Sequence, residues 1–201
     1  VLIGAGPSCE PLVSIGGEIA MLDSRGNTLW RRPAAESPFV NRLDGGFAVV
    51  SPSADRSAHL EVIADNGRPI QSVDLPVSGR ITSVGIQPRS DLGIEAIGVC
   101  TDVTSPCSKP EGNRGPFNAL LTATSKHDFR ALERHVQGHL NFAPYQDGIL
   151  VASSPSDGET ELVLRDSAQG ITWQTALPGR LSAGPYAGPS GEIYVGTCSG
   201  W

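Results

Sequence analysis

The histidines are the first residues whose spacing could support chemistry. His135 and His139 stand four residues apart, and on a helix this spacing would place both imidazoles on one face, as in zinc hydrolases. The glutamate that such a motif carries beside its first histidine is absent, and Gly138 would interrupt the helix. His59 and His127 are isolated in the sequence. We therefore predict solvated histidines on strands and no histidine metal site.

Serine and aspartate residues give no stronger indication of a reaction. A nucleophilic serine at a strand-to-helix elbow needs a Gly-x-Ser-x-Gly motif, which neither Ser182 nor Ser199 has. Asp23, Asp65 and Asp166 could suggest calcium, but each is a single carboxylate followed by a turn glycine. Such carboxylates commonly accept hydrogen bonds from the backbone of their own turn. The sequence therefore predicts no catalytic, cofactor-binding or metal-binding residues.

Four cysteines form an even set: Cys9, Cys100, Cys107 and Cys198. Cys100 and Cys107 bracket a short loop, where a local disulfide is plausible. Cys9 and Cys198 are expected at equivalent places of the repeat described below, and they would meet if the two ends closed one small ring. This set favours an exported protein, extracellular, on the cell surface or periplasmic, because disulfides persist in oxidising compartments. Free buried thiols in a cytosolic protein are the alternative.

A long connection at 101–117 is the best candidate for a binding loop. It carries Lys109, Glu111, Asn113 and Arg114 and is far longer than the corresponding connections elsewhere in the chain. Long irregular loops in compact domains are often functional, and a local disulfide would reduce the entropy lost on binding. The alternative is an insertion that the surface tolerates.

Composition restricts the partners and the class of fold. The formal net charge of -6 argues against nucleic acid, which requires clustered Lys and Arg. The longest apolar runs are too short to span a bilayer as a helix. The 24 glycines and 16 prolines are scattered without a short period, which is typical of many short strands joined by tight turns.

One phrase of sequence occurs twice, at 18–30 and at 161–173. In each copy an apolar strand ends at an aspartate, a glycine-bearing turn follows, and a second strand carries a tryptophan, Trp30 or Trp173. Weaker copies lie at 59–67 and 119–128. Both tryptophans are predicted to pack between neighbouring sheets, where a large ring buries much area. In the second unit the equivalent stretch, 68–73, lacks the ring, which predicts weaker packing of that unit.

A second phrase falls between copies of the first: a hydrophobic strand that usually follows a glycine and ends in small residues. It occupies 46–51, 95–100, 148–153 and 191–196, and 1–6 is interpreted as a fifth copy. An extended stretch precedes each internal copy, so each unit holds four strands, named A to D in chain order. A helix at 131–136 is possible, but the frame of the other units favours strand D there.

These strands predict an all-β chain, a β-propeller of four-stranded antiparallel blades. The units are about 1–36, 37–78, 79–137 and 138–179, with a partial unit at 180–201, all in one domain or propeller fragment. Their spacing of roughly 40–50 residues is in the range of propeller blades. Four units and a partial one predict part of a larger ring, or else a small ring closed by strands from both ends.

The phrases resemble the repeats of pyrroloquinoline-quinone-like propellers. The matching pieces are MLDSRGNTLW at 21–30, LRDSAQGITWQ at 164–174 and GEIYVGT at 191–197. That family includes quinoprotein alcohol and glucose dehydrogenases, and also non-catalytic members such as an outer-membrane assembly lipoprotein. The dehydrogenases carry an adjacent cysteine pair and a carboxylate beside bound calcium, which no residues here match. The resemblance therefore implies the fold and the non-catalytic branch.

The expected function is a non-enzymatic binding or scaffold module of an exported or cell-surface protein, which recognises protein or glycan through its loops. No cofactor is expected. The alternative is part of a quinoprotein oxidoreductase, with pyrroloquinoline quinone and calcium, whose catalytic residues lie outside this chain. A lyase or hydrolase on the same scaffold is a third possibility.

Overall fold

A computed structural model describes residues 2–35, 37–52, 57–77, 79–89, 93–101, 117–125, 128–134, 139–156 and 158–198 of the chain. These residues form strands and turns, and none of them lies in a helix. The predicted strand at 131–136 is present as far as Arg134, in the strand that runs from Asp128.

The described residues form eighteen strands, arranged in five antiparallel sheets that follow one another in chain order. The first sheet holds β1 (Leu2–Ala5), β2 (Pro11–Ile15), β3 (Glu18–Leu22) and β4 (Thr28–Pro33). The second holds β5 (Phe39–Leu43), β6 (Gly46–Pro52), β7 (Ala58–Ala64) and β8 (Pro69–Leu75). The third holds β9 (Ile81–Pro88), β10 (Ile94–Thr101), β11 (Ala119–Ser125) and β12 (Asp128–Arg134). The fourth holds β13 (His139–Tyr145), β14 (Gly148–Ser156), β15 (Glu159–Arg165) and β16 (Ile171–Pro178). The last holds β17 (Leu181–Ala187) and β18 (Ile193–Thr197).

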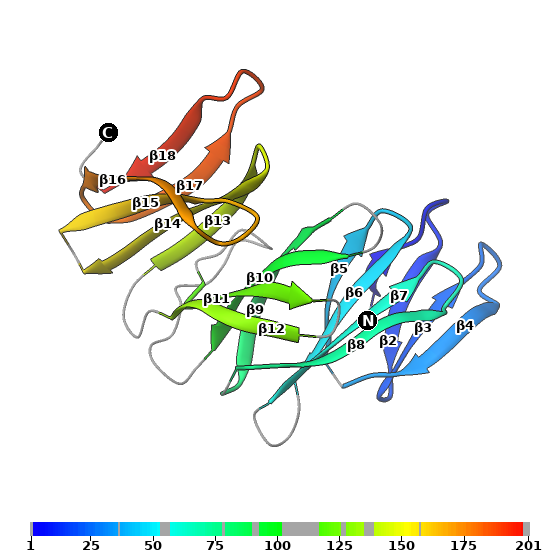
Figure 1. The fold of residues 1–201 in the computed structure, drawn as a ribbon. Coiled ribbons are helices and arrows are strands. Elements are labelled where there is room, and N and C mark those ends of the chain that lie inside the picture. The colour runs from blue at the N-terminus through cyan, green and yellow to red at the C-terminus, as the bar shows by residue number, and fades with distance from the viewer. Residues whose placement is uncertain are drawn as a thin grey trace.

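Each four-stranded sheet is a meander in which consecutive strands pair. The sheets stack face to face, and the first strands of neighbouring sheets approach one another. For example, β1 approaches β5, and β13 approaches β17. Figure 1 shows the series running from the N-terminal sheet to the two-stranded sheet without closing a ring. The predicted fold class, an all-β propeller of four-stranded antiparallel blades, is confirmed by this topology.

Along the second strand of a sheet, successive side chains pack alternately on the preceding and on the following sheet. Phe47 and Val49 of β6 pack against the first sheet, whereas Ala48 and Val50 pack against the third. In β14, Ile149 likewise belongs to the cluster shared with the third sheet. Successive side chains of a strand point to opposite faces, so a run of apolar residues covers both. The strands β6, β10 and β14 therefore carry continuous apolar runs, because each lies between two other sheets.

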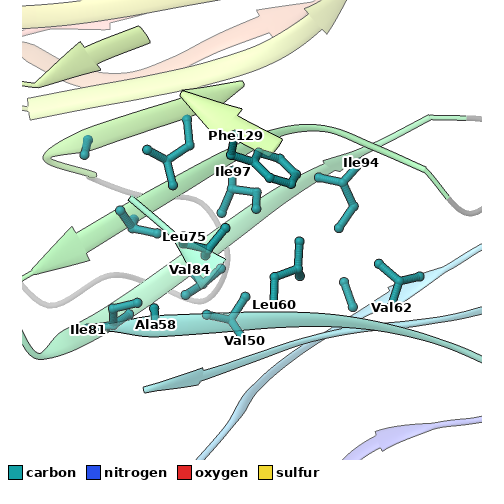
Figure 2. Close-up of a cluster of buried hydrophobic side chains, with 14 of the residues drawn as sticks. Val50, Ala58, Leu60, Val62, Leu75, Ile81, Val84, Ile94, Ile97 and Phe129 are labelled. Carbon is teal, nitrogen blue, oxygen red and sulfur yellow. The ribbon is translucent and has the colours of Figure 1, made fainter. Parts of the chain in front are cut away.

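The largest buried cluster lies between the second and third sheets. Figure 2 shows Val50, Leu60 and Val62 of the second sheet facing Ile97 and Phe129 of the third. This is the interface in which the sequence predicted weaker packing, because its outer strand β8 lacks a tryptophan. That prediction is wrong, since aliphatic side chains of both sheets and the Phe129 ring of the third sheet fill the space without a tryptophan.

The first sheet corrects one strand assignment. Residues 1–6 were expected to form a strand B, but β1 occupies the place of strand A, and strand B is β2. Ile15 pairs with Glu18 across Gly16 and Gly17, which have φ of 59° and 81°. A two-residue turn with positive φ at both positions is a strong hairpin signal. The Gly-Gly dipeptide could have located β2 in the sequence.

Two of the three repeat aspartates shape their own turns, as predicted. Asp23 Oδ1 accepts hydrogen bonds from the backbone N–H groups of Arg25 and Asn27, both at 2.8 Å. Asp166 Oδ1 accepts from the N–H of Gly170 at 2.8 Å, and from that of residue 168 at 2.9 Å. The bonds from Asn27, first its side chain and then its backbone, lower the pKa of Asp23. Asp65 differs, because its carboxylate pairs with an arginine of β5 within the same sheet.

Trp30 lies between the first and second sheets. Its indole Nε1 donates a hydrogen bond of 2.8 Å to the carbonyl oxygen of Asp65, and its ring centroid lies 6.4 Å from that of Phe47. A Cβ added to Gly67 would lie 2.6 Å from the ring, so glycine is required at this turn. Trp173, at the equivalent place on β16, is 42% exposed.

The two tryptophans should therefore differ in their contribution to stability. We expect Trp30→Ala to lower the free energy of unfolding by about 3 kcal/mol, as loss of a packed aromatic ring does. Trp173→Ala should cost less than about 1 kcal/mol, because the ring is largely exposed. Urea unfolding followed by circular dichroism measures both. Equal losses would contradict this account of the interface.

Candidate functional site

The predicted binding loop lies outside the described residues. This holds for Lys109, Glu111, Asn113 and Arg114, and also for Cys107. The predicted disulfide between Cys100 and Cys107 therefore stays a prediction, with Cys100 buried at the end of β10.

The two terminal cysteines are not equivalent in the structure. Cys9 lies between β1 and β2, a connection from strand A to strand B, whereas Cys198 follows strand B of the last sheet. Both thiols are free and exposed. A Cys9–Cys198 pair was expected only if the two ends closed a small ring, and the described sheets form an open series instead, as Figure 1 shows. The equivalent places expected for the two cysteines depended on the mistaken assignment of β1.

The histidines form no common site in the described part of the chain. His59 on β7 contacts Asp74 Oδ1 at 2.7 Å through Nδ1 and Ser72 Oγ at 2.9 Å through Nε2, both on the neighbouring β8. His139 opens β13, as predicted. His127 and His135 lie outside the described residues.

A pocket that the sequence did not predict lies among the first strands of the last three sheets. It has a volume of about 310 Å³ and receives residues from β9, β13 and β17 together with Phe117. We call it the inner-strand pocket. Its lining consists of Ile86, Gln87, Pro88, Phe117, Asn141, Phe142, Ala143, Pro144, Gly184, Pro185 and Tyr186.

Each of the three first strands, β9, β13 and β17, contributes a proline to this pocket. These are Pro88, Pro144 and Pro185. Proline has no N–H to donate to a sheet ladder, and it occurs in strands mainly at edges and ends. The first strand of each sheet is such an edge, because it pairs on one side only. A proline near the end of three consecutive first strands is the sequence signal that could have found the pocket.

Two phenylalanines build one wall. Phe117 and Phe142 have ring centroids 5.6 Å apart at an interplanar angle of 44°. Phe117 also exchanges backbone hydrogen bonds with Leu140 of β13, at 2.8 and 3.1 Å. The next residue, Asn118, uses its side chain to bond both the N–H and the carbonyl of Thr101. The segment at 117–118 thus joins the third sheet to the fourth and fixes the aromatic wall.

The polar groups of the lining are amides and one phenol. Gln87 is 5% exposed and donates through Nε2 to Glu95 Oε2 at 2.7 Å. Gln87 Oε1 and Asn141 Oδ1 are both buried without a hydrogen-bond partner among the described residues. The lining residues carry no carboxylate, imidazole, amine or thiol. This arrangement favours binding of an apolar group over acid–base chemistry.

Among the described residues, no group of three or more His, Cys, Asp or Glu side chains could hold a metal ion. Within the same residues, no helix is long and apolar enough to cross a membrane.

The sequence matches no protein-family model. A search of curated proteins also finds no match. Similar solved structures include a protein of unknown function from Bacteroides caccae, with 14% identity and a TM-score of 0.46 over 85% of this chain and 58% of that chain. Another is the WD40 domain of Pan2 from Neurospora crassa, with 13% identity and a TM-score of 0.40 over 86% of this chain and 47% of that chain. This chain thus spans less than two thirds of either structure. The fold class follows from the strand topology described above.

Gly98 of β10 provides the room for the aromatic wall. An added Cβ would lie 2.5 Å from Phe142 and 2.6 Å from Phe117. We expect Gly98→Ala to lower the free energy of unfolding by about 1–3 kcal/mol, because overpacking forces the rings apart. Gly158→Ala is the matched control, since its Cβ would meet no atom within 4 Å. Similar urea midpoints for both variants would show that the wall is not tightly packed.

His139 should make stability depend on pH. Its burial, and secondarily the charge of Arg180, lower its pKa below the ordinary value of 6.5. The unfolded chain therefore takes up a proton near pH 6.5 that the folded chain takes up only at lower pH, so stability falls on acidification through this range. We expect His139→Gln to lose less stability than the unmodified chain between about pH 7.5 and 5. Urea unfolding at several pH values measures this difference, and parallel curves would contradict it.

Proposed function

We propose that this chain is a non-enzymatic binding module and that the inner-strand pocket holds an apolar segment of a protein partner. The observation that carries the proposal is the lining: three prolines, two phenylalanines in tilted ring contact and the half-exposed Tyr186, converging from three sheets. Its volume of about 310 Å³ is at the lower end of the range for ligand sites. The pocket therefore suits one or two side chains of an extended segment.

The resemblance of the repeats supports a narrower assignment. We propose that the chain is of the pyrroloquinoline-quinone-like propeller type, on its non-catalytic branch, and acts in an exported or cell-surface protein. A disulfide between Cys100 and Cys107, as predicted from the sequence, would be consistent with that location, whereas Cys9 and Cys198 are free thiols. Carbohydrate is the second kind of partner expected from the sequence, but the scarcity of hydrogen-bonding groups in the lining favours protein.

The quinoprotein alternative fits the pocket less well. Calcium prefers carboxylate and carbonyl oxygen ligands, and the lining residues supply no carboxylate. Their side-chain oxygens are two buried amides and a phenol. A quinone held by calcium would have to be bound by residues outside this pocket.

Pro144→Asp tests the proposed pocket. Pro144 is exposed at the rim, so a carboxylate there should oppose an apolar ligand without disturbing the core. We expect peptides selected on the chain from a random phage-displayed library to be rich in apolar residues. They should bind Pro144→Asp at least about tenfold more weakly, which corresponds to about 1.4 kcal/mol. Pro69→Asp, at an exposed proline of β8, is the matched control and should bind normally.

Two results would overturn the proposal. Binding to a glycan array without any enriched peptide would show that the partner is carbohydrate. Dye-linked alcohol oxidation after addition of pyrroloquinoline quinone and calcium would show that the chain is an enzyme.

A further inference from the structure

We propose that Ser72 is an activated nucleophile and a site of covalent modification, which accepts an acyl group from an activated carboxylic ester. The proposal depends on three side chains of the second sheet, those of His59 on β7 and of Ser72 and Asp74 on β8. We call them the Ser72 trio. The proposal is independent of the inner-strand pocket, because none of the three residues lines it.

The pairing of β7 with β8 brings the Ser72 trio together. His59 stands directly opposite Asp74, and Glu61 stands opposite Ser72. Alternate residues of a strand lie on one face of a sheet, so Ser72 and Asp74 share the face that carries His59. Nδ1 of His59 lies 2.7 Å from Asp74 Oδ1, and Nε2 lies 2.9 Å from Ser72 Oγ. Strand register alone therefore assembles the trio.

The chemistry of the partners determines the direction of each hydrogen bond. A carboxylate only accepts, so Nδ1 of His59 carries a proton and donates it to Asp74. In the neutral imidazole Nε2 is then an acceptor, and the hydroxyl of Ser72 donates to it. This is the order of hydrogen bonds in Ser-His-Asp hydrolases, where the imidazole withdraws the serine proton as the oxygen attacks.

The acyl transfer needs no oxidant and no cofactor. Oγ of Ser72 attacks the carbonyl carbon of the ester, and its proton passes to Nε2 of His59. The Oγ–C bond forms, the bond from carbon to the leaving oxygen breaks, and the imidazolium returns the proton to the leaving group. The products are an acylated serine and a free alcohol. Asp74 is a positioning residue, because it acts by holding the Nδ1 proton of His59.

The surroundings of Ser72 permit this reaction. The carboxylate of Glu61, opposite Ser72, would oppose negative charge on the carbonyl oxygen under attack. Glu61 forms an ion pair with Arg32 of β4, which offsets its charge. The side chains of His59 and Asp74 are 43% and 87% exposed, and Ser72 is exposed as well. The second sheet packs against a neighbour on each side within this chain, so this exposure does not arise from either end of the sequence.

The open position of the trio favours a single acyl transfer over repeated turnover. An exposed sheet face does not enclose a substrate, and enclosure is what makes binding energy available for catalysis. The alkyl ester formed on Ser72 is also less reactive than the activated ester that supplied the acyl group. Stoichiometric modification is therefore the expected outcome, and it is compatible with a non-enzymatic binding module.

The histidine–aspartate pair is not a feature of the repeat. In the corresponding place of the pairing register, Glu18 stands opposite Pro33 in the first sheet and Glu161 stands opposite Ala176 in the fourth. Both of these sheets form without the pair. Substitutions in the trio should therefore leave the fold intact, and circular dichroism with urea unfolding checks this for every variant below.

Treatment of the full chain with para-nitrophenyl acetate tests the proposal. Peptide mass spectrometry separates acetylation of Ser72 from that of the amines of the chain. We expect Ser72 to be acetylated at least about tenfold faster than Ser182, an exposed serine of β17 that serves as internal control. His59→Gln should slow acetylation of Ser72 at least about tenfold, because the proton acceptor is lost. His139→Gln, on β13, is the matched control and should leave the rate unchanged.

Asp74→Asn tests the positioning role. The amide it introduces can donate a hydrogen bond to Nδ1, which favours the tautomer with a protonated Nε2 that cannot accept from Ser72. We expect acetylation of Ser72 to slow about tenfold in this variant. Combined with His59→Gln, the same substitution should cause no further loss, since Asp74 acts through His59. A merely structural role would lower the rate in both backgrounds.

Equal acetylation rates at Ser72 and Ser182, or an unchanged rate at Ser72 in His59→Gln, would overturn the proposal. Sustained ester hydrolysis that Ser72→Ala abolishes would also overturn it, because the site would then be catalytic and not an acceptor. Pro144→Asp should be acetylated at Ser72 normally. Failure of the Ser72 trio can therefore be distinguished from failure of the pocket.

Discussion

The structure depends on one constraint: a sheet whose second strand is apolar on both faces must be covered on both sides. Residues 46–50 of β6 are all buried, and alternate members of the run pack on the first and on the third sheet. A single sheet with two apolar faces is not stable in water, because burial of apolar area is the main favourable contribution to folding. Face-to-face stacking is therefore a condition of each sheet being folded at all. The first sheet shows what happens when one face is not covered in this way: Leu2 and Ile15 on its outer face are about two-thirds exposed.

The same constraint explains where a pocket can form. Faces of neighbouring sheets are filled by alternating side chains, whereas the first strands approach one another without sharing a hydrogen-bonded ladder. The space between these first strands is filled only by their side chains. Where these are prolines and an alanine, as in β9, β13 and β17, a hollow persists. The pocket thus results from short, rigid side chains on strands that belong to three separate sheets.

Local features of the chain could be predicted from its sequence. The turn aspartates at 23 and 166 accept hydrogen bonds from the backbone of their own turns. The repeat predicted the fold class and the pairs of strands C and D correctly, although it assigned β1 as strand B and missed β2. Features that depend on distant residues could not be predicted. The pocket unites Pro88, Pro144 and Pro185, whose proximity follows from the stacking of sheets and from nothing in their local sequence. The prediction of weaker packing at β8 failed for a related reason, because aliphatic residues and the Phe129 ring of the next sheet compensate for the absent tryptophan.

Trp30 and Trp173 show this limit within one repeat. Their local sequences, strand pairing and register shift agree, yet one ring is enclosed and the other is 42% exposed. The difference lies in the next sheet along the chain, which supplies Phe47 and the Asp65–Gly67 turn to Trp30 and, among the described residues, β17 and β18 to Trp173. A repeat phrase of this kind therefore determines only one side of an interface. The unit that packs against it determines the other side, so the exposure of each ring could not be predicted from the phrase alone.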